Sequence, residues 1–365
     1  MEINATALKI PFKIAFKHAH AERRQTQSIF VIIKKNGHIG LGEACPREYV
    51  TGETVASCLL WVDNNKTSIA KCCTNIQTLR TWEIIHRSDI DQNPSAWCAV
   101  ELALLDLFAK EENKTVEQLL LLDSSAGTYQ YSAVIGDGND QAFSQTLATY
   151  AKFGFKDYKL KVSGDSKSDN LRIKEIVESC DNIRVRLDAN NLWDRNIDLA
   201  KTYLKALDHQ VFAVEEPLAV RDFDGMKKIS DQLNLSVIFD ESVCNIHDLD
   251  QVSLLPQNCI INVRISKMGG LLRSLEIIDQ IKQQGFKVIV GCLVGETSLL
   301  SRVALIAAKY SGDSLVAQEG AFGDFLLEYD YVEPMIRFGA KGIFRLQNSE
   351  LQQENGWGLS VSKQE

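Results

Sequence analysis

The chain has 365 residues, of which 45% are hydrophobic and 24% are charged, and its 40 Lys and Arg residues against 48 Asp and Glu residues leave a formal net charge of -8. This composition is typical of a globular protein large enough for one barrel or two domains. The acidic balance argues against a protein that binds nucleic acid through its phosphates. Since the apolar runs are too short to cross a bilayer and Met1 begins no secretory signal, we expect a cytoplasmic protein without a membrane partner.

The first 125 residues are predicted to form a small α+β domain. Two apolar, β-branched runs are followed by Asn36-Gly37, which favours a tight hairpin, and then by a third apolar run. These features predict a small antiparallel sheet with strands at residues 5–16, 28–34 and 39–43. Apolar residues then recur at helical spacing, which predicts helices at residues 54–62, 75–87 and 95–110.

From Tyr131 the chain changes to short β runs, each followed by an amphipathic stretch. Their starts are roughly 22 to 28 residues apart, the length of one strand and one crossover helix. Eight such units predict a parallel (β/α) barrel at residues 126–321, and a doubly wound open sheet is the alternative, although its Gly-x-Gly-x-x-Gly turn is missing from the sequence. We expect the remaining residues, 322–365, to pack back on the N-terminal domain. The eight runs are residues 131–135, 158–162, 183–187, 211–214, 236–239, 259–263, 287–290 and 314–317.

The second of these runs carries two lysines that can do chemistry. Lys159 and Lys161 alternate with apolar residues, so both side chains point to one face of the strand. Two neighbouring ammonium groups lower each other's pKa, and a lysine with a lowered pKa can act as a general base near neutral pH. The alternative is a solvent-facing strand whose lysines extend into water.

The third, fourth and fifth runs each end in a carboxylate, at Asp188, Glu215 and Asp240. The chemistry of a parallel barrel is built at these strand ends, and three acids that meet there repel one another unless a cation holds them. Oxygen ligands alone suit Mg²⁺. A helix N-cap is the alternative role for any single acid, but three on consecutive strands beside a lysine pair favour a metal site.

With these motifs in this order, the sequence resembles the enolase superfamily, and within it the mandelate racemase and muconate lactonising enzyme family. The resemblance also rests on the Lys-x-Gly-Gly segment that begins at Lys267 and on the helix at residues 99–106. It implies a barrel with an N-terminal capping domain. It also implies that Mg²⁺, held by the three carboxylates, assists removal of the proton α to a substrate carboxylate, with Lys161 as the base and Lys159 beside it.

The chain departs from this family's racemases and epimerases at the end of the sixth strand. The resemblance places a second catalytic lysine there, where this sequence has Arg264. Arginine stays protonated and cannot remove a proton at neutral pH. Lys267 lies three residues further on and could replace the missing partner only if its side chain reached the same site. We therefore expect a reaction on one face of the substrate, with Arg264 steadying the enolate.

The expected substrate-binding residues come from loops. The resemblance implies that two loops of the capping domain close over the barrel, with Lys17 and His18 in the first and Arg47 and Tyr49 in the second. The cationic side chains of the first loop suggest a substrate with a second anionic group. Glu296, after the seventh strand, and Glu319, after the eighth, are further candidates, although the Asp-x-Asp of the family's dipeptide epimerases is missing at Glu319.

These features together predict a Mg²⁺-dependent isomerase of a small carboxylate substrate, similar to muconate cycloisomerase, that forms an enolate. The alternatives are a racemase or epimerase of N-acyl amino acids or dipeptides, a dehydratase of acid sugars, and a protein that binds a metal and a ligand without turnover. We also expect a homo-oligomer.

Overall fold

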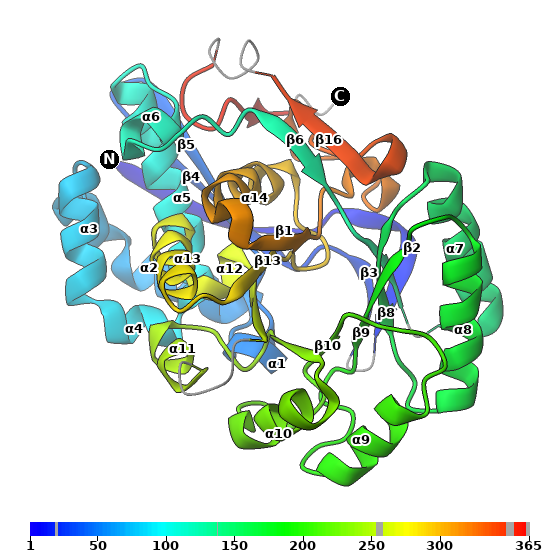
Figure 1. Ribbon diagram of the computed structural model, residues 1–365. Coiled ribbons are helices and arrows are strands. Elements are labelled where there is room, and N and C mark those ends of the chain that lie inside the picture. Colours follow the sequence, from blue (N-terminus) through cyan, green and yellow to red (C-terminus); the bar gives the residue numbers. More distant parts are fainter. Residues whose placement is uncertain (19–20, 137, 253–257, 348–353, 363–365) are drawn as a thin grey trace.

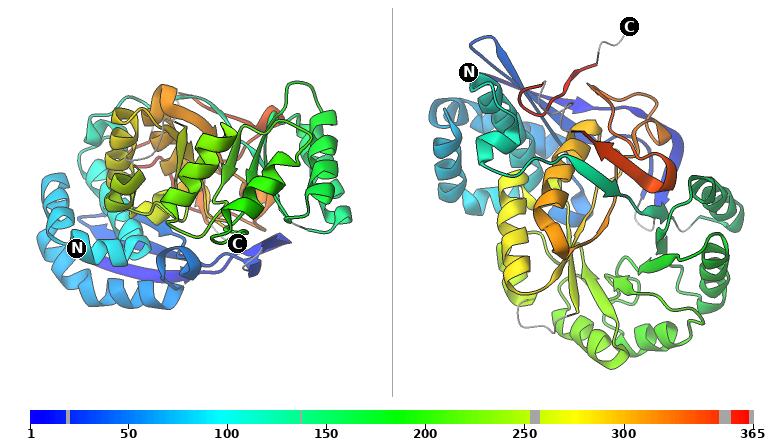
Figure 2. Two further views of the ribbon diagram at one scale, coloured as in Figure 1. Left: turned by 60° about the horizontal axis from the view of Figure 1, so that its bottom comes forward. Right: turned by 45° about the horizontal axis from the view of Figure 1, so that its top comes forward.

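The computed structural model describes residues 1–18, 21–136, 138–252, 258–347 and 354–362, with the side chains of residues 14–22 outside the described part. An N-terminal capping domain covers one side of a parallel barrel (Figure 1). In the two views of Figure 2 the capping domain is blue to cyan and the barrel is green to orange. No helix in the described ranges is both long enough and apolar enough to span a bilayer.

The capping domain is built on a three-stranded antiparallel sheet with strand order β1-β4-β5. The longest buried helix, α5, lies across this sheet at Gly40 and Gly42 of β5. A Cβ atom at Gly42 would come within 1.9 Å of the Ala99 carbonyl oxygen, so only glycine allows this close approach. The predicted strand at residues 5–16 is two strands, because the chain turns at Ile10, whose N–H donates to Thr26 Oγ1 at 2.8 Å.

The secondary structure elements of the capping domain include three helices that the sequence did not predict, α1, α4 and α6. The strands are β1 (Glu2–Leu8), β2 (Pro11–His18), β3 (Ala21–Gln25), β4 (Ser28–Lys35) and β5 (His38–Ala44). The helices are α1 (Glu48–Thr51), α2 (Val55–Cys72), α3 (Ile76–Ile85), α4 (Arg87–Gln92), α5 (Pro94–Glu111) and α6 (Val116–Leu120).

Eight parallel strands follow in the order in which they occur along the chain, from β7 to β14. The backbone N–H of Ser132, next to β7, donates to the carbonyl oxygen of Gln318 in β14 at 2.8 Å and joins the first strand to the last. The (β/α) barrel predicted from the spacing is therefore confirmed, and each predicted strand overlaps an observed one. Its strands are β7 (Ala133–Ile135), β8 (Asp157–Lys161), β9 (Arg184–Asp188), β10 (Ala213–Glu215), β11 (Ser236–Phe239), β12 (Cys259–Val263), β13 (Lys287–Val290) and β14 (Leu315–Gln318).

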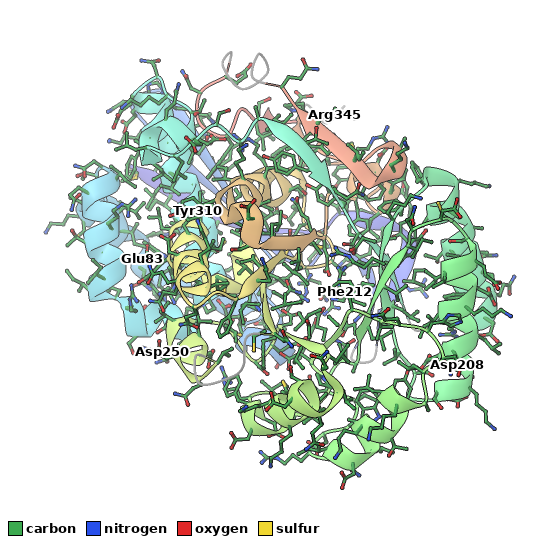
Figure 3. All side chains as sticks on the ribbon, in the orientation of Figure 1. Glu83, Asp208, Phe212, Asp250, Tyr310 and Arg345 are labelled. Atoms are coloured by element: carbon green, nitrogen blue, oxygen red, sulfur yellow. The ribbon has the colours of Figure 1, made fainter. Side chains whose placement is uncertain are left out.

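Helices cover the outside of the barrel, and side chains fill its interior (Figure 3). One buried layer inside it consists of small and branched residues from five neighbouring strands, Ala213, Ile238, Ile260, Ile289 and Ala317. The helices between the strands are α7 (Asp140–Phe153), α8 (Ser166–Glu178), α9 (Ile197–Lys205), α10 (Phe223–Leu233), α11 (Ile246–Val252), α12 (Ile265–Met268), α13 (Leu271–Gln283) and α14 (Ser298–Ser311).

A buried carboxylate of the capping domain binds the N-terminus of a barrel helix and so joins the two domains. Glu101 of α5 accepts hydrogen bonds from the N–H groups of Leu271 and Leu272, both at 2.8 Å, at the start of α13. Gly270 precedes this helix with φ +107°, and a Cβ there would lie 2.5 Å from the Glu101 carboxylate. The second glycine of the Lys-x-Gly-Gly segment thus makes room for a carboxylate of the capping domain.

Residues after 321 contact both domains. Trp357 is buried, and its indole N–H lies 3.1 Å from the Leu41 carbonyl oxygen and 3.2 Å from that of Leu102, both in the capping domain. The strand β16 (Ile343–Leu346) pairs instead with β6 (Gly127–Gln130) beside the barrel, and β15 (Val332–Glu333) pairs with β17 (Ser360–Val361). Short 3₁₀ turns occupy residues 312–314, 323–325 and 340–342. The proposed boundaries at residues 125 and 321 stay a prediction.

Candidate active site

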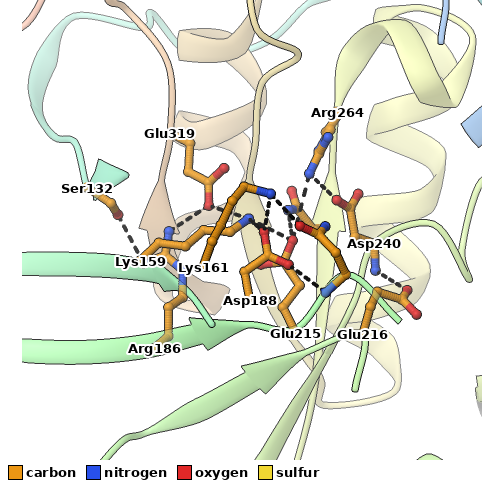
Figure 4. Close-up of polar contacts among 12 residues, drawn as sticks. Ser132, Lys159, Lys161, Arg186, Asp188, Glu215, Glu216, Asp240, Arg264 and Glu319 are labelled. Carbon is orange, nitrogen blue, oxygen red and sulfur yellow. Dashed lines mark hydrogen bonds and ion pairs between the residues drawn. The ribbon is translucent and has the colours of Figure 1, made fainter. Parts of the chain in front are cut away.

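The two lysines of β8 lie side by side at the carboxyl end of the barrel (Figure 4). Lys159 is buried, and its Nζ lies 2.8 Å from Glu215 Oε1 and 3.2 Å from Asp188 Oδ2. The Lys161 side chain is 12% exposed, and its Nζ lies 3.2 Å from Asp188 Oδ2 and 2.5 Å from Asn190 Oδ1. Lys161 is therefore the more accessible of the two, and Asp188 and Asn190 fix the direction of its Nζ.

The carboxylates at the ends of the neighbouring strands are buried and bonded to basic groups. Asp188 ends β9, Glu215 ends β10 and Asp240 follows β11. The Asp240 carboxylate binds the guanidinium of Arg264, and its Oδ1 lies 3.0 Å from Lys267 Nζ. The structure thus gathers these three acids and the basic groups of the sequence prediction at one end of the barrel.

Burial and charge act against each other on these groups. Burial by itself lowers the pKa of Lys159, but the charges of Asp188 and Glu215 outweigh it and raise the pKa well above its ordinary value. Burial by itself raises the pKa of Asp188, but the charges of Lys159 and Lys161 outweigh it and hold the pKa below its usual range. Burial and the charges of Asp188 and Asp240 outweigh Lys159 and raise the pKa of Glu215 to about 8. The expectation that the lysine pair lowers its own pKa values is therefore wrong for Lys159, because the surrounding acids dominate.

Arg264 lies across the mouth of the barrel from Lys161. It follows β12, which is four strands along from β8 in a barrel of eight, so the two side chains approach from opposite sides. Arg264 is 9% exposed, and the charges of Asp240 and Glu241 outweigh burial and raise its pKa well above the ordinary value. Both side chains line one cavity, with walls made of Arg23, Arg47, Tyr49, Val134, Lys159, Lys161, Asp188, Asn190, Glu241, Arg264, Cys292, Leu293, Val294, Glu319 and Phe322.

The three acids suit a hard divalent cation in their chemistry. They offer oxygen atoms only, they end consecutive strands, and Glu215 Oε2 is buried without a hydrogen-bond partner. In the described part of the chain no group of three His, Cys, Asp or Glu side chains is arranged to hold a metal ion. The oxygens of Glu215 and Asp240 are instead bonded to Lys159 and Arg264. The residues therefore fit Mg²⁺ by chemical type and by their place at the ends of consecutive strands.

The wall formed by the capping domain contains two of the predicted substrate-binding residues. Arg47 is 3% exposed and donates through Nη2 to the Val294 carbonyl oxygen at 2.5 Å and through Nη1 to that of Gln27 at 3.1 Å. It therefore fastens the capping loop to the loop after β13, besides lining the cavity. Tyr49 is 40% exposed, and the guanidinium of Arg23 lies 5.8 Å from its ring centroid.

Three other candidates do not contribute described contacts to the cavity. Lys17 and His18 belong to β2, but their side chains lie outside the described part of the chain. Glu296 is described and is absent from the cavity wall, since its Oε1 accepts the Leu293 N–H at 2.7 Å and closes the turn after β13. The expectation that Glu296 contacts the substrate is not supported, because its carboxylate serves the local turn.

Glu319 and Lys267 are both held by other side chains. Glu319 lines the cavity, but its Oε1 lies 2.6 Å from Arg186 Nη2 and 3.4 Å from Lys159 Nζ. Lys267 is fully buried in α12 and donates to the main-chain oxygen of Asp240 at 2.6 Å as well as to its carboxylate. Lys267 does not line the cavity, so the structure does not support it as a second base.

Sequence reasoning missed several cavity residues. Asn190 lies in the turn after β9 with φ +44°, so strand periodicity does not predict that its Oδ1 meets Lys161. Arg23 and Cys292 come from loops, whose path the periodicity of the sequence does not predict. Arg186, which lies below the cavity and bonds the cavity residue Glu319, could not be predicted either, because a basic residue inside a barrel strand carries no chemical motif.

Comparison with known proteins agrees with this geometry. Residues 142–365 match the model of the family described as "Enolase C-terminal domain-like". The chain belongs to this family. It is 27% identical over 330 residues to a hydrophobic dipeptide epimerase of Enterococcus faecalis, covering 88% of this chain and 90% of that protein. It is 26% identical to an N-succinyl-L-Arg/Lys racemase of Bacillus cereus, covering 82% and 81%.

A solved structure of the Enterococcus faecalis dipeptide epimerase, complexed with Mg and the dipeptide L-Leu-L-Tyr, superposes with a TM-score of 0.80. It is 25% identical, and the match covers 98% of both chains. These relatives confirm the predicted superfamily and the isomerase class, and they agree with Mg²⁺ as the cofactor of the family. They support the racemase or epimerase alternative above the muconate-cycloisomerase interpretation.

Proposed function

We propose that the protein forms an enolate from an N-acylated amino acid by removing the proton α to its carboxylate, from one face only. The observation that carries this proposal is the pair of side chains on opposite walls of the cavity, Lys161 on one and Arg264 on the other. A lysine can exchange a proton with carbon, whereas a guanidinium stays charged and can only donate hydrogen bonds.

Asp188, Glu215 and Asp240 are the residues that would hold Mg²⁺. Bound there, Mg²⁺ would act as a Lewis acid and stabilise the negative charge that develops on the substrate carboxylate. Lys159, charged and buried between Asp188 and Glu215, adds a fixed positive charge at the same place.

Lys161 acts as the base in this proposal. Asp188 and Asn190 hold its Nζ at the cavity wall, so the amine is directed to one face of the substrate. Arg264 on the other face has a buried Nε without a hydrogen-bond partner, which can donate to an oxygen of the substrate. A proton removed and returned at Lys161 gives exchange with retained configuration, which is the half-reaction that this lysine can carry out alone. A net isomerisation requires in addition that the enolate takes up a proton from a second donor or reacts at another of its atoms.

An N-acyl group is favoured over a free ammonium group on the substrate. In the family's dipeptide epimerases the end of the eighth strand carries an Asp-x-Asp for that ammonium, whereas the acid here, Glu319, is already bonded to Arg186 and Lys159. The capping wall adds the positive charges of Arg23 and Arg47. Five basic and three acidic side chains line the cavity, which suits an acyl group with an anionic end.

Deuterium exchange tests the proposal. The protein is incubated with Mg²⁺ in D₂O with N-succinyl and N-acetyl amino acids and with free dipeptides, followed by mass spectrometry and chiral chromatography. We expect exchange with retained configuration, fastest for N-succinyl substrates. Inversion at the rate of exchange would show a second base, and the lack of exchange with every compound would overturn the proposal. Loss of water or ring closure would instead indicate a dehydratase or a cycloisomerase.

Two variants identify the groups that act. Lys161→Met should lower the exchange rate by about 10²- to 10⁴-fold, the usual contribution of a general base, while Lys66→Met, which removes a surface pair with Asp63, should leave it unchanged. Arg264→Lys puts a titratable amine on the second face, so inversion should appear alongside exchange. If Arg264→Lys exchanges without inversion, the opposed placement of the two side chains is wrong.

A further inference from the structure

A buried arginine lies below the cavity, inside the barrel, and takes no part in the chemistry proposed above. Arg186 is two residues before Asp188 on β9, so the two side chains point the same way, and it is fully buried. Its Nη1 binds the Asp157 carboxylate and lies 3.1 Å from Ser132 Oγ, and its Nη2 lies 2.6 Å from Glu319 Oε1. Figure 4 shows it reaching from the strand towards Ser132 and Glu319.

These contacts cross the seam at which the barrel closes. Ser132 precedes β7 and Glu319 follows β14, the first and last strands of the barrel, and Asp157 begins β8. One planar guanidinium therefore fixes three strands by its separate donors. A lysine at this position would offer a single charged group and could not hold Asp157 and Glu319 with the same geometry.

The same carboxylate oxygen of Glu319 also faces Lys159. Oε1 lies 2.6 Å from Arg186 Nη2 but 3.4 Å from Lys159 Nζ, whereas that Nζ lies 2.8 Å from Glu215 and 3.2 Å from Asp188. Arg186 thus takes the shorter bond to Glu319, and the Lys159 ammonium lies nearer the acids at the mouth of the barrel. Without Arg186, Lys159 would be the cation left beside Glu319 and would be drawn down towards it.

We propose that Arg186 is a positioning residue, which holds Glu319 so that Lys159 stays between Asp188 and Glu215. The catalytic part of this inference rests on the proposed function, because Lys159 matters there as the fixed charge beside the substrate carboxylate. The structural part stands without it, since it concerns the position of Lys159 in the folded protein.

Crystal structures of the full chain and of its Arg186→Met and Arg186→Met/Glu319→Gln variants test the structural part. We expect the Lys159 ammonium to leave Glu215 for Glu319 in the single variant and to return to Glu215 in the double variant, in which the uncompensated charge is gone. If Lys159 keeps its bond to Glu215 in Arg186→Met, the inference is overturned. This readout requires neither Mg²⁺ nor a substrate, so the failure of the proposed function would leave it intact.

Kinetics test the catalytic part. On the substrate that exchanges fastest, Arg186→Met should lower kcat by about 10- to 100-fold, as displacement of a catalytic group by about 1 Å does, and Arg186→Met/Glu319→Gln should recover part of it. The matched control is Arg302→Met. Arg302 is likewise a buried arginine and does not line the cavity, and it has a carboxylate at 2.6 Å on Glu117 and a hydroxyl at 3.1 Å on Ser125. The Arg302→Met variant should have a lower free energy of unfolding and an unchanged kcat. Equal effects of the two substitutions on kcat would make Arg186 merely structural.

Discussion

Replacement of Glu101 by alanine should weaken the attachment of the capping domain to the barrel and lower the free energy of unfolding. Its carboxyl group is fully buried and accepts the N–H groups of Leu271 and Leu272 at 2.8 Å each. Burial, with the charge of Glu83, raises the pKa of Glu101 to about 8, while the two N–H groups act to lower it. Each buried N–H left without an acceptor costs about 1–3 kcal/mol, so Glu101→Ala should lower the free energy of unfolding by about 2–6 kcal/mol.

The measurement is urea unfolding followed by tryptophan fluorescence, with Glu111→Ala as the control. Glu111 lies at the end of the same helix, α5, and makes a partly exposed ion pair with Lys35 at 2.8 Å. Its replacement should cost under about 1 kcal/mol. The difference between the two variants reports mainly the buried hydrogen bonds of Glu101. If the two variants unfold at the same urea concentration, the attachment of the capping domain through Glu101 is refuted.

Three further substitutions test other contacts between the domains. Gly270→Ala should lower the thermal midpoint, because its φ of +107° disfavours alanine and the new Cβ would lie 2.5 Å from Glu101; an unchanged midpoint would contradict this. Glu43 accepts a hydrogen bond from Thr297, and burial raises its pKa to about 8. The contribution of Glu43 to stability is therefore full below about 4.5, its unfolded pKa, and is lost as the pH rises through about 8. Glu43→Gln should flatten the fall of the thermal midpoint between pH 6 and pH 9, which thermal unfolding at several pH values measures. Arg47→Met should raise KM more than it lowers kcat, because it releases the capping loop; equal changes would argue against this role.

The barrel could be predicted because its signal repeats. Eight apolar runs at a regular spacing identify eight βα units, and the polar residue at the end of a strand must then face the carboxyl end of the barrel. Asp188, Glu215 and Asp240 were found in this way, and the structure brings them together with the lysines of β8. Local periodicity and the direction of the strands are enough to predict which residues lie at the carboxyl end of the barrel.

The partners of these residues could not be predicted from the sequence. The environment of Lys159 depends on Glu319, 160 positions later in the chain, and on which of two cations that acid binds. The pKa shift of a buried lysine is the sum of the effects of desolvation and of several nearby charges. The direction of this shift can change when one carboxylate is added or removed. A pair of lysines in a sequence therefore predicts a site but not the direction in which the pKa of Lys159 is shifted.

The placement of Arg264 shows why one residue can change the reaction without changing the fold. Lys161 and Arg264 are separated by four strands, so barrel closure alone sets them on opposite sides of a substrate, whichever residue stands at position 264. A lysine and an arginine both place a positive charge beside Asp240, although only the guanidinium offers a planar fork of donors. The difference that matters for the reaction is the ability to release a proton, which decides whether the configuration of the product can invert. The distinction between one-face and two-face chemistry thus depends on the chemistry of a single side chain and not on the architecture that positions it.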